Sequence, residues 1–409
     1  MISVGKAQKL VVEKTRPLAT VRVPTGEAMG RVATRDVTAP IDLPRFASAS
    51  MDGYAVSSRD TRGASRGSPA KLRIVRRRIL AGSKPGLAVP DGAAVRIMTG
   101  APLPTGVDAV IAQEDARIER GALWMDGPLR AGTNVRRVAE DCRKGEKALA
   151  AGTLVQPGVV ALLAALGVNR IEVRRPPRVA IVVTGNEVRR PTARSLPEWA
   201  VRDSHAAFLR AALQEFRIRP ALVSYARDRV PDIRRRIARA LDRADLVIVT
   251  GGVSVGERDL VRPVLSTLDV RTVFWGVAQR PGKPLYFGTR GNVAVFGLPG
   301  NPASTIVCYC EYVRPAIRKM LGYRRCYPEE WAARLATPIR PAGGRTRFLR
   351  GRLTMHGGAW AVSVARRQAS HMLGAFVGSD CLVIVPARVR GSLEVRSQVR
   401  VHPFPWRKP

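Results

Sequence analysis

Carboxylates and hydroxyls beside glycine recur along this chain in segments typical of loops. They occur at Asp52-Gly53, at Thr99-Gly100, at Thr184-Gly185 with Glu187 following, and at Gly256-Glu257 with Asp259 following. Taken singly, each is more often an ordinary turn, because Asp and Thr bond the nearby backbone and glycine accepts unusual dihedral angles. If several of these carboxylates converged beside basic groups, they would suit a hard cation such as Mg²⁺ that bridges phosphate oxygens.

A second candidate is a rigid basic turn, Arg280-Pro281-Gly282-Lys283-Pro284. It places two cations where a phosphate or another oxyanion could be held, although a solvated basic turn fits the pattern equally well. Asp203 and Ser204 stand before an apolar helical repeat, so a helix cap is the simplest interpretation, and such a cap is compatible with a ligand loop. The four histidines are too dispersed to predict a metal cluster or a serine-type triad.

A parallel α/β sheet would position most of these residues. Continuous apolar runs at 179–183, 221–225 and 246–250 predict strands, and the apolar periodicity between them predicts two helices. The order strand, helix, strand, helix, strand is typical of a parallel sheet covered by helices. Ligands of such sheets bind beyond the carboxyl ends of the strands.

Polar or glycine-rich segments fall at those strand ends, at residues 184–187, 251–259 and 297–304. The third of them separates a strand at 293–296 from a long apolar helix that continues to Leu321. Exposed backbone N–H groups at the start of that helix would suit an anion.

Other parts of the chain have a β-rich pattern. Residues 45–141 contain short strand-like runs between Gly and Pro residues, and the region after residue 326 contains strand-like runs at 346–354, 360–364, 382–385 and 393–401. The longest apolar stretch, Val159–Val168, suits a buried helix, and the amphipathic N-terminal region is its candidate partner.

The charge balance is strongly basic. The 409 residues include 69 Lys and Arg against 32 Asp and Glu, a formal net charge of +37 at pH 7. The arginines are scattered through nearly every segment, which favours solvated basic faces as the explanation, with a general attraction of anionic ligands as the alternative. No aromatic-interleaved basic motif accompanies the charge, so we do not expect nucleic-acid binding.

Composition excludes several protein classes. With 45% hydrophobic and 25% charged residues, the chain is neither disordered throughout, collagen-like nor a disulfide-stapled miniprotein, and its length predicts roughly two to four domains. Its apolar runs are too short for a membrane span, and the N-terminus lacks the pattern of a secretory signal, so we expect a cytoplasmic protein. Five cysteines without C-x-x-C spacing predict neither a zinc site nor a disulfide framework.

Several segments, in order along most of the chain, resemble one known family. They are Met51–Val56, Arg96–Pro104, Thr184–Glu187, Ser254–Asp259, Pro281–Pro284 and Gly297–Ser304. Together they resemble the molybdopterin molybdenumtransferases of molybdenum-cofactor synthesis, of which the gephyrin E domain is the eukaryotic relative.

The resemblance implies an α/β plus β architecture, in an elongated homodimer of four-domain subunits. Its domains would be an N-terminal dimerisation or linker domain at 1–44 and 142–176, a β-rich insert at 45–141, a doubly wound molybdopterin-binding domain at 177–325, and a small β domain at 326–409. The active cleft would lie between the doubly wound domain of one subunit and the insert of the other. Members of the family bind adenylylated molybdopterin, release AMP in a Mg²⁺-dependent step and insert molybdate into the dithiolene. Partners would include a molybdopterin adenylyltransferase and molybdoenzymes, with no membrane.

Carried over position by position, the resemblance also assigns roles to residues. The catalytic set would be Asp52, Thr99, Asp141, Glu187 and Asp259, with Glu187 and Asp259 also holding Mg²⁺. Substrate contacts would come from Thr184, Gly185, Asp203, Ser204, Gly251, Gly252, Ser254, Arg280, Lys283, Pro299, Gly300, Asn301, Pro302, Arg345 and Ser370.

Some positions depart from the family pattern. Arg280 stands where Lys is usual, which keeps the charge but changes the donor geometry, and Gly276 falls where many relatives carry another lysine. His205 replaces a usual Asn, and Ser48-Ala49-Ser50 replaces Asn-Ser-Ala. The acids are intact, so we expect an active molybdenumtransferase. The alternative is a non-catalytic carrier of molybdopterin or of the finished cofactor that docks on molybdoenzymes.

Overall fold

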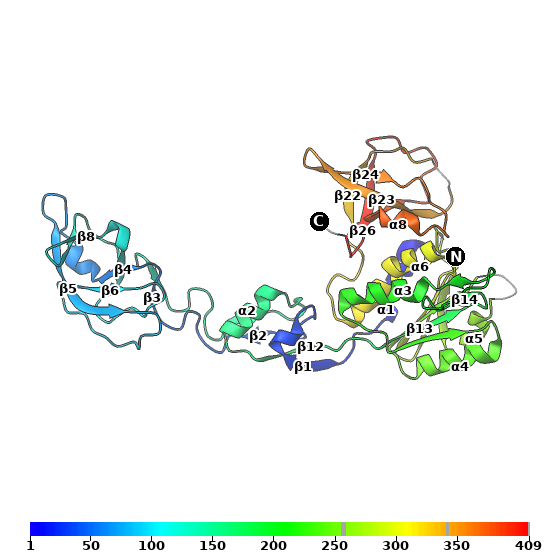
Figure 1. Cartoon of the computed structure of the whole chain (residues 1–409), viewed down its shortest axis with the longest axis horizontal. Coiled ribbons are helices and arrows are strands. Elements are labelled where there is room, and N and C mark those ends of the chain that lie inside the picture. Colours follow the sequence, from blue (N-terminus) through cyan, green and yellow to red (C-terminus); the bar gives the residue numbers. More distant parts are fainter. Residues whose placement is uncertain (255–258, 341–342, 408–409) are drawn as a thin grey trace. The chain divides into compact units, whose positions relative to one another are not determined.

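The computed structural model describes residues 1–254, 259–340 and 343–407, which fall into two compact units (Figure 1). The larger unit comprises Met1–Val21, Gly30–Thr34 and Glu172–Pro409, and the smaller one comprises Arg22–Met29 and Arg35–Ile171. No helix among the described residues is both long and apolar enough to cross a membrane. All five cysteines are free and buried.

A six-stranded sheet forms the centre of the larger unit. Its strand order is β16-β13-β17-β21-β20-β18. The first four strands are parallel to one another, β20 is antiparallel to β21, and β18 is antiparallel to β20. The strands are β16 (Leu222–Ala226), β13 (Val179–Thr184), β17 (Leu246–Thr250), β21 (Val293–Leu298), β20 (Tyr286–Arg290) and β18 (Arg271–Trp275). The parallel sheet predicted from the apolar runs is therefore confirmed.

Helices cover both faces of this sheet (Figure 1). Alternate residues of β13 point to opposite faces: Val179, Ile181 and Val183 pack in one apolar cluster, whereas Ala180 and Val182 pack in the other. The first cluster includes residues of α1 (Val4–Lys14), α3 (His205–Leu213), α6 (Pro302–Cys308) and α7 (Arg314–Met320), and the second includes residues of α4 (Val230–Leu241) and α5 (Val261–Thr267). Burial on both faces explains why these strands are continuous apolar runs in the sequence.

The long helix predicted to continue to Leu321 is present, with one irregularity. A π-helical turn, Tyr309–Val313, joins α6 to α7, and all five of its residues are buried. Such turns inside helices are frequent at functional sites. Helix α1 packs on α7, so the first residues of the chain belong to the α/β part of the larger unit.

The C-terminal part of the larger unit is a β domain. Its strands have the order β19-β23-β24-β22-β26-β25, and an additional pairing of β23 with β25 closes the sheet. The elements are β19 (Gln279–Arg280), β22 (Trp331–Leu335), β23 (Thr346–His356), β24 (Ala359–Val364), β25 (Cys381–Val385), β26 (Gln398–Pro403) and the short α8 (Gly374–Val377). The strand predicted at 393–401 begins only at Gln398, because Arg396 has a φ of 70°, which an extended strand does not permit.

The smaller unit is built on a six-stranded sheet of order β7-β4-β6-β5-β9-β8. These strands are β4 (Gly53–Val56), β5 (Ala70–Ile79), β6 (Ala93–Ile97), β7 (Ala109–Ala112), β8 (Arg117–Glu119) and β9 (Ala122–Met125). Gly53 is required at its position, because a Cβ there would lie 1.9 Å from the carbonyl oxygen of Ile111. Apolar clusters cover both faces of the sheet.

The apolar stretch at 159–168 does form a helix, α2 (Pro157–Ala165), but the prediction that it is buried is wrong. Leu163 is its one buried residue within the smaller unit. The helix packs on the 3₁₀ turn η1 (Thr25–Ala28) and on β11 (Lys147–Leu149), and its residues other than Leu163 are partly or fully exposed.

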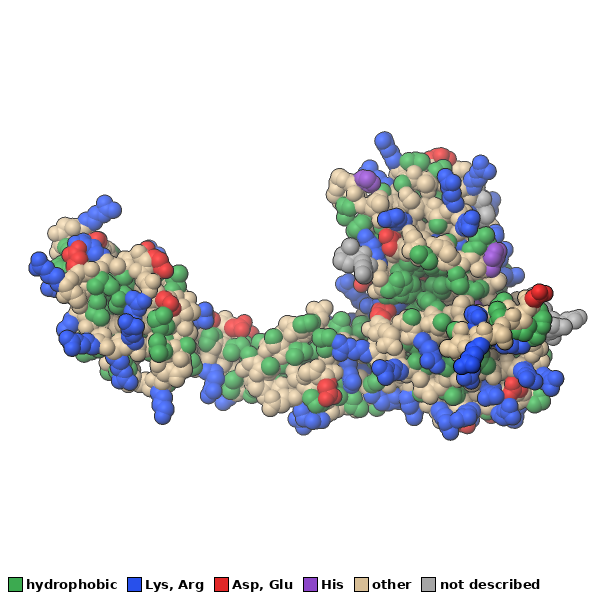
Figure 2. All heavy atoms as spheres, in the orientation of Figure 1, with side chains coloured by type: hydrophobic (Ala, Val, Ile, Leu, Met, Phe, Trp, Pro, Cys, Tyr) green, Lys and Arg blue, Asp and Glu red, His purple; other side chains and the backbone are tan. Residues whose placement is uncertain are grey.

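The remaining short elements complete the chain. They are β1 (Thr20–Pro24), β2 (Val37–Thr38), β3 (Ser48–Ala49), β10 (Val135–Arg136), β12 (Arg170–Arg174), β14 (Val188–Arg189) and β15 (Val201–Arg202), with 3₁₀ turns η2 (Ser58–Thr61), η3 (Gln113–Asp115) and η4 (Gln214–Phe216). Lys and Arg side chains are spread over the visible face of each unit and are not gathered in one patch (Figure 2). The limits proposed for the four domains stay predictions.

Candidate active site

A cavity of about 410 Å³ lies in the larger unit, where loops of the α/β sheet meet the β domain. Loops after β17 and β21, the turn after β19 and two segments of the β domain form its wall. The lining residues are Gly252, Val253, Ser254, Asp259, Gln279, Arg280, Pro281, Gly282, Lys283, Pro284, Pro299, Gly300, Asn301, Ser304, Arg345, Gln368, Ala369 and Ser370. The cavity lies beyond the carboxyl ends of parallel strands, where ligands of such sheets bind.

Positive charge dominates the cavity wall. Arg280, Lys283 and Arg345 face one described carboxylate, that of Asp259. A fourth cation is close, because burial and then the charge of Arg280 lower the pKa of Arg347. Among the described residues, none of the three lining cations forms an ion pair. An anionic ligand would supply the missing negative charge.

The cationic turn is held at both ends by backbone hydrogen bonds. The Val277 amide donates to the Lys283 carbonyl at 2.9 Å, and β19 pairs in parallel with the first residues of β23, so Arg280 lies opposite Arg347. This pairing brings the turn beside Arg345, which directly precedes β23. Two parts of the chain about 60 residues apart therefore supply the cations of one site.

Residues after β13 and β17 shape the neighbouring backbone. The Thr184 hydroxyl donates to the Thr250 carbonyl at 3.1 Å. Gly251 has a φ of 86°, and a Cβ there would lie 2.7 Å from the Thr184 Oγ1. Thr184 and Gly251 thus pack against each other directly behind the cavity, although neither lines it. Gly185 packs in the same way against the side chain of Glu187, whose oxygen would lie 2.8 Å from an added Cβ.

Asp203 caps helix α3, as the sequence predicts. Its Oδ1 accepts hydrogen bonds from the backbone N–H groups of His205 at 2.8 Å and Ala206 at 3.1 Å. Its Oδ2 accepts from the Tyr225 hydroxyl at 2.9 Å, and burial together with this bond raises the pKa of Tyr225 to about 12. Ser204 is the residue that begins the helix, but its side chain makes no capping bond.

His205 connects these loops to the cavity. Burial lowers its pKa, while the Gly300 carbonyl and the charges of Asp203 and Glu187 act in the opposite direction. Its ring therefore lies beside Gly300 of the wall and close enough to Glu187 for the charge of that carboxylate to act on it. The Nε2 atom is buried and has no hydrogen-bond partner among the residues that the structure describes.

The expectation that free N–H groups at the start of α6 would hold an anion is wrong for three of them. The Ala303 amide donates to the Ser370 carbonyl, and the amides of Ser304 and Thr305 donate to the Asn301 carbonyl, all at 3.0–3.1 Å. The Ala303 bond joins the 299–304 loop to the β domain, and the other two bonds lie within the loop and the first turn of α6. Pro302 occupies the first helical turn, where it has no N–H to offer.

Three predicted site residues belong to the smaller unit. Asp52 Oδ1 accepts hydrogen bonds from the Thr99 amide at 2.8 Å and from the Thr99 hydroxyl at 2.7 Å, and these bonds lower the pKa of Asp52. Asp141 is exposed, and its amide donates to the Leu43 carbonyl at 3.0 Å. The structure thus brings Asp52 and Thr99 into contact.

The residues present fit a Mg²⁺ ion that is held partly by substrate. Among the described residues, no three His, Cys, Asp or Glu side chains cluster as a metal site. Mg²⁺ is usually bound by one or two carboxylates, several waters and substrate phosphates, and not by a cage of protein ligands. Asp259 is the carboxylate that the described part of the wall offers for this smaller requirement, whereas Glu187 does not line the cavity.

Ten of the predicted substrate and catalytic residues line the cavity, and others lie behind it. Those in the wall are Gly252, Ser254, Asp259, Arg280, Lys283, Pro299, Gly300, Asn301, Arg345 and Ser370. Glu187, Thr184, Gly185, Gly251, Asp203, Ser204 and Pro302 belong to the same unit but not to the wall. Gly256 and Glu257 lie outside the described residues.

Three residues that received no role from the sequence take part in the site. Gln279 and Gln368 line the cavity, and Gln368 Nε2 donates to the Arg350 carbonyl at 3.0 Å. Arg350 is fully buried, and its Nη2 donates to the carbonyls of Arg367 and Ala369. It therefore supports the segment that carries Ser370. No local sequence pattern distinguishes Arg350 from the exposed arginines nearby, because its burial is visible only in the structure.

Family models match successive parts of the chain. Residues 2–167 match the MoeA N-terminal region (domain I and II), residues 180–319 a probable molybdopterin binding domain, and residues 332–404 the MoeA C-terminal region (domain IV).

Full-length relatives are similar along the whole chain. A molybdopterin molybdenumtransferase of Haemophilus influenzae is 32% identical over 99% of both chains, and one of Synechococcus elongatus is 35% identical over 91% of both. A crystal structure of a molybdopterin biosynthesis MoeA protein from Pyrococcus horikoshii is 30% identical, covers 99% of both chains and superposes with a TM-score of 0.82. A second structure of a MoeA protein from that organism, 27% identical, has a TM-score of 0.85 and covers 99% of this chain and 100% of its own.

Proposed function

Since this chain belongs to the molybdopterin molybdenumtransferase family, we propose that it inserts molybdate into adenylylated molybdopterin with release of AMP, in molybdenum-cofactor biosynthesis. The observation that supports this function best is the cavity, whose three cations form no ion pair with any described residue and whose wall has one described carboxylate. Both reactants are anions, and a concave site with this excess of positive charge suits them.

The lining cations have a direct role in this proposal. When the phosphoanhydride of the adenylylated substrate is cleaved, negative charge grows on the departing phosphate oxygens. Fixed positive groups directed at those oxygens stabilise that charge more than they stabilise the bound substrate. Lys283 and Arg280 on the turn, with Arg345 beside them, are the groups we assign to this task.

Mg²⁺ is the cofactor in the proposal, with Asp259 and Glu187 as its protein ligands. When bound, the ion would supply positive charge that stabilises the negative charge of the substrate phosphates. Asp259 would orient the phosphates from the cavity wall, and Ser254 lies in the same wall. His205 is beside Glu187 and Gly300, so we assign it the positioning of that loop.

The proposal also includes partners. The active assembly would be a homodimer in which Asp52, Thr99 and Asp141 of a second subunit complete the site. A molybdopterin adenylyltransferase would deliver the substrate, molybdoenzymes would receive the product, and the protein would act in the cytoplasm. The short hydrogen bonds between Asp52 and Thr99 support a shared role for this pair.

AMP release by the purified protein tests the function. Adenylylated molybdopterin is supplied with and without Mg²⁺ across a molybdate titration, and AMP is quantified. We expect release that depends on both ions, and a large loss in Asp259→Ala and Lys283→Met. Lys9→Met is the matched control, because Lys9 is 71% exposed and pairs only with Glu13 on α1. Tight pterin binding without any AMP release would contradict the proposal and identify a carrier instead.

A further inference from the structure

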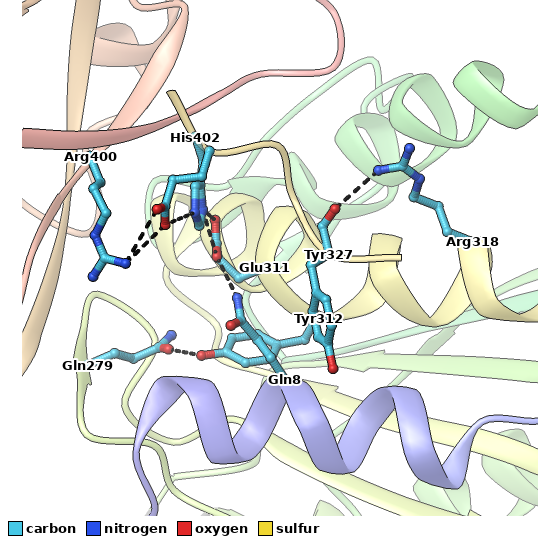
Figure 3. Close-up of polar contacts among 9 residues, drawn as sticks. Gln8, Gln279, Glu311, Tyr312, Arg318, Tyr327, Arg400 and His402 are labelled. Atoms are coloured by element: carbon cyan, nitrogen blue, oxygen red, sulfur yellow. Dashed lines mark hydrogen bonds and ion pairs between the residues drawn. The ribbon is translucent and has the colours of Figure 1, made fainter. Parts of the chain in front are cut away.

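One wall residue of the cavity, Gln279, is fully buried although it directly precedes the exposed Arg280. Its side chain points away from solvent into the space between the cationic turn and the helix that contains Tyr312 (Figure 3). Buried amides are retained at a cost unless their hydrogen bonds are satisfied. The partners of Gln279 therefore indicate what it does.

The amide nitrogen of Gln279 holds the inner side of the turn. Nε2 donates to the Pro281 carbonyl at 3.1 Å and lies 3.4 Å from the Gly282 carbonyl and 3.7 Å from the Cys308 sulfur. Pro281 and Gly282 are buried, whereas the flanking Arg280 and Lys283 are exposed. The two carbonyls are thus turned inward to Gln279, while the two cationic side chains start from the outer side.

The turn fits closely around this amide. Gly282 has a φ of 90°, and a Cβ added there would lie 2.6 Å from both Gln279 Nε2 and the Cys308 sulfur. A side chain at this position would have to displace the amide. The direction of the backbone between Arg280 and Lys283 is therefore fixed by packing as well as by hydrogen bonds.

Tyr312 fixes the orientation of the amide itself. Its hydroxyl donates to the Oε1 of Gln279, which leaves Nε2 directed at the turn (Figure 3). Tyr312 is fully buried in the π-helical turn, and burial raises its pKa well above the ordinary value, so it stays a donor. Its neighbour Glu311 accepts from Gln8 at 2.9 Å and is bonded to His402, so the same turn is tied to α1 and to the β domain.

We propose that Gln279, oriented by Tyr312, is a positioning residue that directs Arg280 and Lys283 into the anion cavity. The inference rests on the proposed function only for the identity of the anions. Long cationic side chains are flexible, and their effectiveness depends on a fixed starting direction. Without the amide, the buried Pro281 carbonyl would lose this donor, the Gly282 carbonyl would keep the weak Cys308 thiol donor at 3.9 Å, and the turn would relax to find other partners.

The experiment replaces the amide without changing side-chain size. Gln279→Met is compared with Lys283→Met, which removes a cation outright, and with Gln8→Met, which removes an amide from the same buried network without touching the turn. Binding of molybdate and of adenylylated molybdopterin is measured by calorimetry on the full chain, and KM and kcat for AMP release are measured separately.

We expect Gln279→Met to weaken binding of the same anion whose binding Lys283→Met weakens, by about tenfold in Kd and KM. A factor of this size is expected when one positioned hydrogen bond to a charged group is misdirected. Gln8→Met should stay within about twofold, although both Gln variants lower thermal stability. Tyr312→Phe, which removes only a hydroxyl, should weaken binding of the same anion by a smaller factor. This variant also tests the proposal if Gln279→Met does not fold.

The outcomes separate the inference from the proposed function. Normal anion affinity in both Gln279→Met and Tyr312→Phe, with impaired binding in Lys283→Met, would overturn the positioning role. Unchanged affinity for both anions in Lys283→Met would also overturn it, because the turn would then hold no anion. A wild-type protein that binds molybdate but releases no AMP would overturn the function alone, since the calorimetric comparison remains valid.

Discussion

Asp245 bonds to the segments at the amino ends of neighbouring strands in the α/β sheet. Its loss should lower the free energy of unfolding by a measurable amount. Its side chain is 11% exposed and accepts a two-point hydrogen bond from Arg175, with Nη1 2.7 Å from Oδ2 and Nη2 2.8 Å from Oδ1. The Arg178 amide donates to the same Oδ2 at 2.8 Å. The carboxylate thus joins the entry to β13 with the start of β17.

The pKa of Asp245 gives the size of the effect. Burial alone would raise it, but the hydrogen bonds from Arg175 and Arg178 dominate and lower it from 3.8 to about 2. Because the folded pKa lies below the unfolded one, the ionised carboxylate stabilises the fold above pH 4, and this stabilisation disappears as the pH falls from about 4 to 2. The difference corresponds to about 2 kcal/mol, so Asp245→Asn should lower the free energy of unfolding by about 2 kcal/mol at pH 7.

Urea unfolding followed by tryptophan fluorescence measures this effect, because every tryptophan except Trp124 lies in the larger unit. Asp242→Asn is the matched control: Asp242 is 66% exposed and pairs with Arg290 at 3.1 Å, so its loss should cost less than about 0.5 kcal/mol. The gap between wild type and Asp245→Asn should close near pH 2. A gap that is equal at pH 7 and pH 2.5, or no larger than that of the control, would refute the reasoning.

Two further substitutions test packing at the site and at the domain junction. Gly282→Ala should lower the midpoint of thermal unfolding more than Gly82→Ala does. Both glycines have a positive φ, but only an alanine at position 282 places its Cβ against the Cys308 sulfur. Equal midpoints would contradict this packing. His402→Leu leaves the buried Glu311 without its main partner and should cost about 3 kcal/mol. Burial lowers the pKa of His402, but the charge of Glu311 and its hydrogen bond to the ring raise that pKa above its ordinary value overall. The loss of unfolding free energy, measured with urea, should therefore be largest below pH 6.5 and shrink as the pH rises through the folded pKa. A loss that grows with pH would contradict the pairing.

The central sheet could be predicted because its strands are buried on both faces. A strand of this kind is apolar at every position, so the run at 246–250 coincides with β17, and the run at 179–183 misses β13 by one residue. The prediction of a strand over 393–401 was wrong in its first half. This run alternates in polarity like a strand, but its first half contains a turn at Arg396, whose positive φ no hydropathy pattern encodes.

Long-range packing was the part that the sequence could not provide. The stretch at 159–168 is apolar enough to predict burial, yet α2 finds partners on one side only within its unit. Helix α1 lies against α7, more than 290 residues along the chain from it. Hydrophobic periodicity shows that a face needs a partner and does not show which one.

The site shows the same division. Loop residues beside glycine and the cationic turn could be chosen from local chemistry, and many of them line one cavity. Gln279 and Arg350 could not, because their importance comes from contacts with Tyr312, 33 residues away, and with the 367–369 segment, 17–19 residues away. A glutamine before a basic turn has no distinctive pattern until the helix that holds its amide is known.

The large net charge and the cavity act over different distances. Charges more than about 8 Å apart on the surface are largely screened at physiological ionic strength, so the scattered arginines can raise the rate at which anions arrive but add little to the affinity of one that is bound. The affinity must come from Arg280, Lys283 and Arg345, which line one cavity and form no ion pair within the part of the chain that the structure describes. Added salt should therefore slow association steeply and weaken equilibrium binding less, whereas misdirecting the turn at Gln279 should weaken equilibrium binding at any salt concentration.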